Sequence, residues 1–123
     1  RFVQECDLTV EGAATKWVED FCPHVVIHLA VEKRRDVISR YPAIVEKLNV
    51  RSAMELVQVC ERVGSWLIFL SCEEIFSGAG PPYHEESAPD PVTPLGKQKL
   101  RAERAITATS RRAAILRVPL LYG

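Results

Sequence analysis

The sequence predicts an α/β fold in which helices cover both faces of a parallel β-sheet. Two observations predict it: short, almost continuously apolar runs, and stretches of helical periodicity between them. The apolar runs cover residues 23–30, 66–71 and 113–119. Runs rich in β-branched residues suit strands that are buried on both faces. Strands that alternate with crossover helices form parallel sheets, because each crossover returns the chain to the same end of the sheet.

Before the first of these runs we expect one short strand and one helix. The strand covers residues 2–6. The helix covers residues 9–21, with Thr9 as its N-cap, a position that threonine suits because its hydroxyl accepts a hydrogen bond from a free backbone N–H. Apolar residues at helical spacing form the inner face of this helix. They are Val10, Ala13, Ala14, Trp17 and Phe21.

Two longer helices are predicted between the later strands. The first covers residues 43–63 and ends at Gly64, a residue type that favours the left-handed end of a helix. Its apolar stripe consists of Val45, Leu48, Leu56, Val59 and Val63. The second helix covers about 94–107, and Pro94 suits its first turn because that position needs no backbone donor.

Residues 77–93 interrupt this alternation with a segment rich in glycine and proline. The composition predicts a surface loop within one domain. Ligands bind at the carboxyl ends of strands in parallel α/β sheets, and this loop follows such an end at Ser71 and Cys72. The loop therefore either borders a ligand site or is a connection without a role, and both interpretations stay open.

Charge and length exclude several classes of protein. The chain has 123 residues, enough for one modest domain, and its 16 basic and 16 acidic residues cancel. We therefore expect no nucleic-acid partner and no anionic membrane partner. No apolar run approaches the roughly 18 residues that cross a bilayer. The four cysteines fit a reducing compartment, which we expect to be the cytoplasm or the nucleus.

No metal site is expected. The cysteines form no C-x-x-C pair and have no ligand-like spacing. His24 and His28 share one face of a predicted strand, but strand rise separates them by roughly 13 Å, too far for one metal ion. Structural roles for these histidines are favoured.

The order of short motifs along the chain resembles the extended short-chain dehydrogenases, in particular their dTDP-4-dehydrorhamnose reductase branch. The motifs are His28-Leu29-Ala30-Val31, Leu48-Asn49-Val50, the strand end and turn at 70–78, Pro82-Tyr83-His84-Glu85-Glu86, 95–100 and 116–123. Within that branch, the chain is most similar to the regulatory β subunits of methionine adenosyltransferase. Residues 23–32, the Glu85-Glu86 pair and the closing Arg-Val-Pro-Leu-Leu-Tyr-Gly carry this similarity.

The resemblance covers essentially the whole chain and implies that residues 1–123 are the central part of an NAD(P)-binding Rossmann domain. The expected fold is a partial, doubly wound parallel sheet. The first strands, with their glycine-rich phosphate turn, are expected before Arg1, and the substrate lobe after Gly123. Such a fragment leaves an open sheet edge and isolates the strand near Phe2, so we expect marginal stability of the segment by itself.

Reductases of this superfamily use a tyrosine and a lysine four residues apart, together with a serine or threonine at the preceding strand end. Lys99 stands at the lysine position, but Leu95 replaces the tyrosine and Cys72 replaces the serine or threonine. Leucine has no proton to give, and a thiol is a weak hydrogen-bond donor. The resemblance therefore implies a degenerate catalytic triad and no ordinary carbonyl reduction.

Binding of NADP could survive this loss. By family correspondence, Asp7 and Leu8 flank the adenine, Leu29 lines the cofactor, and Lys33 occupies a basic position. Further candidates are Asn49, Lys99 and Leu121, the last near the nicotinamide end. Ordinary packing is the alternative for the two leucines at 29 and 121, and a solvated charge is the alternative for the lysine at 33. Without the upstream glycine-rich turn, the segment is expected to bind NADP weakly or not at all.

Three functions follow from the sequence. The first is a regulatory, non-catalytic role: binding of the catalytic subunit of methionine adenosyltransferase and modulation of S-adenosylmethionine synthesis. The second is an NADPH-dependent reductase of a dTDP-4-keto sugar with a relocated proton donor. The third is a fragment without function, suggested by the missing ends and by the substitutions at Leu95 and Cys72.

Overall fold

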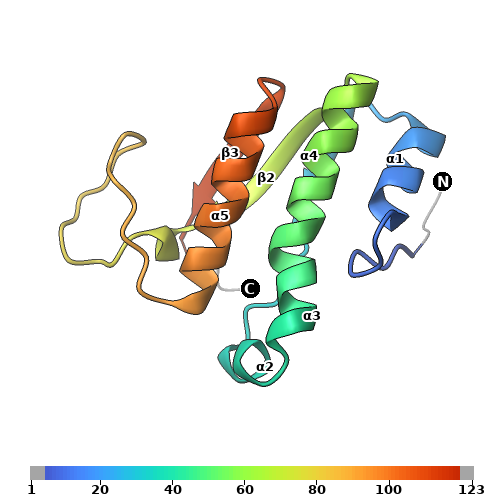
Figure 1. Ribbon diagram of the computed structural model, residues 1–123. Coiled ribbons are helices and arrows are strands. Elements are labelled where there is room, and N and C mark those ends of the chain that lie inside the picture. Colours follow the sequence, from blue (N-terminus) through green and yellow to red (C-terminus); the bar gives the residue numbers. More distant parts are fainter. Residues whose placement is uncertain (1–4, 120–123) are drawn as a thin grey trace.

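A computed structural model describes residues 5–119 of the chain (Figure 1). Helices and strands alternate along it. In chain order they are α1 (Ala13–Phe21), β1 (Val25–His28), α2 (Arg35–Arg40), α3 (Pro42–Glu46), the π-helix η1 (Lys47–Arg51), α4 (Ser52–Val63), β2 (Trp66–Cys72), the 3-10 turn η2 (Glu73–Ile75), α5 (Pro94–Thr109) and β3 (Ala113–Val118).

The three strands form one parallel sheet in the order β1-β2-β3. Val25 pairs with Trp66 at the start of β1, and Leu67 pairs with Ala113 at the start of β3. Each strand falls in one of the three apolar runs, so the predicted parallel α/β sheet is confirmed. Because all strands point the same way, β1 and β2 end on the same side of the sheet, where His28 and Cys72 lie.

One face of the sheet is covered by α1, α4 and α5, which lie side by side in front of the strands in Figure 1. Alternate strand residues point into the core beneath these helices. The core residues are Ala14, Val18, Ala53, Leu56, Val57, Val59, Cys60, Leu67, Phe69, Ala102 and Ile106, with Leu8, Val26, Ala113 and Ile115 packed against them.

The opposite face of the sheet carries apolar side chains that are exposed among the described residues. They come from the other set of alternating positions and include Val25, Ile27, Trp66 and Leu116. The prediction of helices on both faces is thus met on one face only within residues 5–119.

The helix at residues 42–63 is continuous, as its apolar stripe predicts, but it consists of α3, η1 and α4 in succession. Gly64 ends it in the left-handed conformation at φ +82°, which confirms the predicted stop signal. Pro94 stands in the first turn of α5, also as predicted. The preceding Thr93 caps that helix by accepting a hydrogen bond from the Gly96 N–H.

The start of α1 differs from the prediction. The helix begins at Ala13, and its N-cap position is held by Gly12 in the left-handed region at φ +86°. Thr9 instead donates its backbone N–H and its hydroxyl to the Asp7 carboxylate, at 2.9 and 2.7 Å. The prediction of Thr9 as N-cap is wrong because an aspartate two residues earlier forms a local turn with it.

Two further predictions change in the N-terminal half. Val10 lies before the helix and Phe21 is its last residue; both are exposed, and Val18 is buried instead. The short α2 was not predicted, since only Ile38 of its six residues is buried and no apolar stripe marks it. Of the predicted strand over 2–6, residues 2–4 lie outside the described part, and Glu5 and Cys6 are not in a strand.

Candidate functional site

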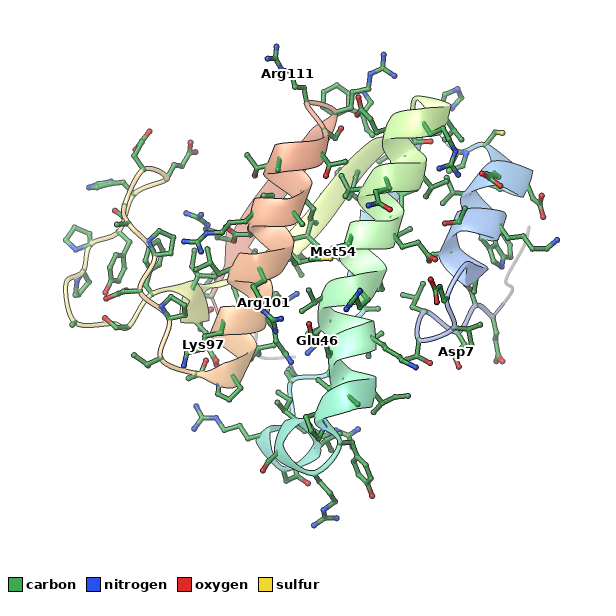
Figure 2. The ribbon with its side chains drawn as sticks, viewed as in Figure 1. Asp7, Glu46, Met54, Lys97, Arg101 and Arg111 are labelled. Atoms are coloured by element: carbon green, nitrogen blue, oxygen red, sulfur yellow. The ribbon has the colours of Figure 1, made fainter. Side chains whose placement is uncertain are left out.

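The carboxyl ends of β1 and β2 meet α5 and η1, and this edge of the sheet holds most of the predicted site residues. Figure 2 shows Arg101 of α5 and Glu46 of α3 pointing toward one another. Their two charge-assisted hydrogen bonds, both 2.7 Å, join the two helices beside the edge. These bonds hold α5 and α3 together beside the edge, where most of the predicted site residues lie.

Asn49 is one of the cofactor candidates, and its side chain is occupied by protein groups. It lies in η1, is 2% exposed, and its amide donates to the Glu32 backbone carbonyl and to Gln98 Oε1, each at 2.8 Å. Its Oδ1 accepts from the Glu32 N–H at 2.8 Å. Asn49 thus holds the segment after β1 against α5, and it uses both amide protons to do so.

Lys99 points inward. Its Nζ donates to the Leu70 backbone carbonyl at 2.7 Å and lies 4.6 Å from the centre of the Phe69 ring. Burial lowers the pKa of Lys99, and the nearby Cys72 and Glu103 partly oppose that shift. The ammonium of Lys99, the residue expected at the family's lysine position, is therefore bound to the sheet and to an aromatic face.

Leu95 and Cys72, the residues expected at the other two triad positions, offer no effective acid. Leu95 lies half-buried in the first turn of α5, and Cys72 ends β2. Burial is the largest cause that raises the pKa of the Cys72 thiol, so the thiol stays protonated at neutral pH. The close approach of α5 to η2 fixes this arrangement: a Cβ on Gly96 would stand 2.0 Å from the Glu74 carbonyl oxygen.

His28 is buried beside these residues. Its Nε2 lies 3.2 Å from the Ser52 hydroxyl, which itself donates to the Leu48 carbonyl, so the imidazole Nε2–H is the donor of the pair. Burial, together with the positive charge of Lys99, lowers the pKa of His28 to about 4. His28 is thus a neutral, structural histidine, as predicted. No group of three metal-ligating side chains occurs within residues 5–119.

The remaining cofactor candidates are more widely spread. Asp7 is exposed, and one of its carboxylate oxygens accepts hydrogen bonds from Thr9. Lys33 is exposed in the segment after β1. Asp7 lies on the far side of α4 from Arg101 in Figure 2. Leu121 lies outside the described residues.

Two clefts adjoin the N-terminal segment. One, of about 490 Å³, lies between α1 and β1, and Leu8 and Leu29 both line it. The other, of about 630 Å³, lies between residues 8–11 and the continuous helix at residues 42–63. Its lining residues include Leu8, Lys47 and Arg51. Neither of these two clefts is lined by a triad position. The structure brings two cofactor candidates, Leu8 and Leu29, to one apolar cleft that Cys72, Leu95 and Lys99 do not line.

The residues present fit part of a dinucleotide. The cleft that Leu8 and Leu29 share offers the apolar surface that an adenine ring requires. A pyrophosphate requires backbone N–H groups of a glycine-rich turn at a helix N-terminus, and no such turn occurs among the described residues. Of the predicted cations, Lys33 is exposed in the segment after β1, whereas Lys99 is bound to the Leu70 carbonyl.

The loop at residues 77–93 is ordered by contacts that the sequence does not reveal. At its base, Ser77 donates its N–H and its hydroxyl to the Asp90 carboxylate, at 2.8 and 2.6 Å. Arg117 of β3 forms two hydrogen bonds with Glu103 of α5, at 3.1 and 2.7 Å. These partners are 13 and 14 residues apart, and no motif relates them.

A parallel sheet whose strands are joined by crossover helices is typical of a Rossmann-like domain. Residues 2–123 match the model of the family described as RmlD substrate binding domain, and the chain belongs to this family. The chain is 42% identical over 120 residues to a Xenopus laevis protein named methionine adenosyltransferase 2 subunit beta. That match covers 97% of this chain and 36% of the relative, so the chain spans about a third of the relative's length.

Solved structures agree with the fold. A dTDP-4-dehydrorhamnose reductase from Clostridium acetobutylicum is 28% identical with a TM-score of 0.88, over 95% of this chain and 42% of that one. A second such reductase, from Bacillus anthracis and in complex with NADP, is 25% identical with a TM-score of 0.87, over 94% of this chain and 42% of that one. The resemblance to the reductase branch and to the β subunits is therefore confirmed.

Proposed function

We propose that the protein is a non-catalytic regulatory subunit of methionine adenosyltransferase, which binds the catalytic subunit and modulates S-adenosylmethionine synthesis. The observation that carries the proposal is the 42% identity, along 97% of the chain, to a protein named as the β subunit of that enzyme. Because the chain spans 36% of that relative, the partner and the regulatory effect are proposals for this chain.

The geometry of the degenerate triad supports a non-catalytic role. Reduction of a carbonyl requires a proton donor beside the substrate, and Leu95 offers none. The raised pKa of Cys72 and the engagement of Lys99 with the Leu70 carbonyl leave neither group poised to replace it. Tyr83 stacks on Phe76, and its hydroxyl accepts a hydrogen bond from the Gly80 N–H, so both groups are engaged within the loop and not beside Lys99.

Weak NADP binding is the second part of the proposal. The apolar cleft shared by Leu8 and Leu29 would hold the adenine, Asp7 would flank it, and Lys33 would meet a phosphate. NADP supplies hydride chemistry in the reductases, but here the absence of a proton donor would leave it a structural ligand. Leu29→Asp should lower NADP affinity at least tenfold, whereas Val92→Asp, also at an exposed apolar residue, should leave it unchanged.

Binding to the catalytic subunit tests the function. The full chain, immobilised, is expected to bind purified catalytic subunit saturably and to change its rate of S-adenosylmethionine formation. The matched control is the double variant Cys72→Ser and Leu95→Tyr, which restores two triad side chains and should leave the effect unaltered. Absence of binding, with a folded chain shown by circular dichroism, contradicts the proposal.

A reductase remains the second candidate, because the solved reductases share the fold at 25–28% identity and Lys99 is retained. NADPH oxidation by the full chain with a dTDP-4-keto sugar, lost in Lys99→Ala, would favour it. No turnover by the chain or by the Cys72→Ser and Leu95→Tyr variant would favour the regulatory role. The same proposal puts the protein in the cytoplasm or the nucleus, which imaging of the tagged chain in cells tests.

A further inference from the structure

The loop between η2 and α5 projects to one side of the sheet, next to β3, in Figure 1. Its base is closed by Ser77 and Asp90, and the Asp90 N–H also donates to the Ile75 carbonyl at 3.0 Å. Within the loop, His84 and Ser87 bond to each other. These bonds shape the loop, but they do not fix residues 79–88 relative to the sheet.

Arg117 ties residues 79–88 to β3, whereas the Ser77 hydroxyl and the Phe76 ring, both at the base of the loop, contact Ala79 and Tyr83. Arg117 Nη1 donates to the Glu85 carbonyl at 3.3 Å, and the Arg117 guanidinium lies 5.5 Å from the centre of the Phe76 ring. On that ring, Tyr83 is stacked in parallel, with ring centres 4.1 Å apart. The tyrosine hydroxyl in turn accepts from the Gly80 N–H at 3.1 Å.

The guanidinium is itself held from the other side. Glu103 of α5, whose side chain is 5% exposed, accepts from Arg117 Nε and Nη2 at 3.1 and 2.7 Å. A bidentate pair of this kind fixes the plane of the guanidinium, which then directs its remaining N–H groups. Here they are directed toward the loop. Arg117 thus joins α5, β3 and the loop through one planar group.

We propose that Arg117 is a positioning residue that holds residues 79–88 in one conformation beside β3, with Glu103 setting the direction of its guanidinium. The inference concerns the order of the loop, and it stands independently of the regulatory function. Lysine cannot replace arginine in this role, because an ammonium cannot form the bidentate pair and contact the Glu85 carbonyl and the Phe76 ring together.

Hydrogen exchange of the full chain, followed by mass spectrometry, tests the inference with Arg117→Lys. That variant keeps a cation beside Glu103, so the fold should persist. Amide exchange over residues 79–88 is expected to become about tenfold faster, while exchange in α5 and β3 stays within about twofold. The NMR signals of the Tyr83 ring should lose the shift that stacking on Phe76 causes. Arg111→Lys, at an exposed arginine that points away from the sheet in Figure 2, is the matched control.

A second variant makes the test independent of Glu103. Phe76→Leu removes the ring that both Arg117 and Tyr83 contact and leaves the Arg117–Glu103 pair, so it should accelerate exchange in the same residues. Unchanged exchange and an unchanged Tyr83 signal in Arg117→Lys would overturn the inference. Equal acceleration throughout α5, β3 and the loop would also overturn it, because Arg117 would then stabilise the fold as a whole.

Discussion

The two faces of the sheet differ in what covers them, although the same three strands supply both. On the helix-covered face, Leu67 and Phe69 are buried beneath α4 and α5. On the opposite face, Ile27, Trp66 and Leu116 are exposed over about half of their surface or more. Both faces are apolar because alternate residues of continuous apolar runs point in opposite directions. The sequence pattern of a doubly buried strand therefore persists where the described chain buries only one side.

The largest expected effect lies on the covered face. Phe69→Ala should lower the free energy of unfolding by about 3–5 kcal/mol, because a fully buried aromatic ring leaves a cavity. Trp66→Ala, on the uncovered face, should cost about 1 kcal/mol. Urea unfolding followed by far-UV circular dichroism measures both. Equal losses would mean that Trp66 is covered in solution.

His28, buried on the covered face, should make the free energy of unfolding fall as the pH is lowered. Its folded pKa, about 4, lies below the unfolded value near 6.5, so the unfolded chain binds the proton first as the pH falls. The contribution of neutral His28 to the free energy of unfolding is complete above pH 6.5 and is lost progressively towards pH 4. Between pH 7 and pH 5 the free energy of unfolding should fall by about 2 kcal/mol. Thermal unfolding at these two pH values measures it. His28→Gln should flatten the dependence, and His24→Gln, at an exposed histidine, should not.

The start of α5 should give a smaller effect. Thr93→Ala removes the cap on the Gly96 N–H and the hydrogen bond to Glu74, and it should lower the free energy of unfolding by about 1 kcal/mol. Thr93→Ser keeps both bonds and serves as the control. A loss in the serine variant as large as in the alanine variant would show that packing of the methyl group, and not capping, is responsible.

The smallest effect is expected from polar substitution on the uncovered face. Leu116→Thr should change the free energy of unfolding by no more than about 0.5 kcal/mol, since the side chain is half exposed and threonine suits a strand. The same change should reduce binding of a hydrophobic dye to the folded chain. A loss above 2 kcal/mol would instead reveal that another segment or molecule buries this face.

The strands, the stop at Gly64 and the first turn of α5 could be predicted from the sequence, because each depends on local conformation or on periodicity. The N-cap of α1 could not, since Asp7 and Thr9 satisfy one another and leave Gly12 to start the helix. The short α2 carries one buried residue and so has no period to detect. Local signals are reliable where no nearby side chain competes for the same backbone group.

The place of some candidate site residues in the fold could be predicted, but their contacts could not. Lys99 and Cys72 were placed at the sheet edge by resemblance, and the structure sets both there. The hydrogen bonds of the Asn49 side chain with Glu32 and Gln98 could not be predicted, since these partners lie 17 and 49 residues away in the sequence. The roles of Leu8, Leu29 and Lys33 toward NADP stay predictions.

The π-helix η1 places one extra residue within the continuous helix at residues 42–63. A π turn accommodates one residue more than an α turn of similar rise, and such turns are frequent at functional sites. Deleting one residue from Lys47–Arg51 would permit a regular α-helix whose residues on either side keep nearly their present orientations, whereas deleting one residue from the regular helix α4 would rotate all preceding residues by about 100°. After a deletion in α4, Asn49 could no longer reach Glu32 and Gln98 from the position it holds beside α5. A one-residue deletion within Lys47–Arg51 should therefore be tolerated better than a one-residue deletion within α4.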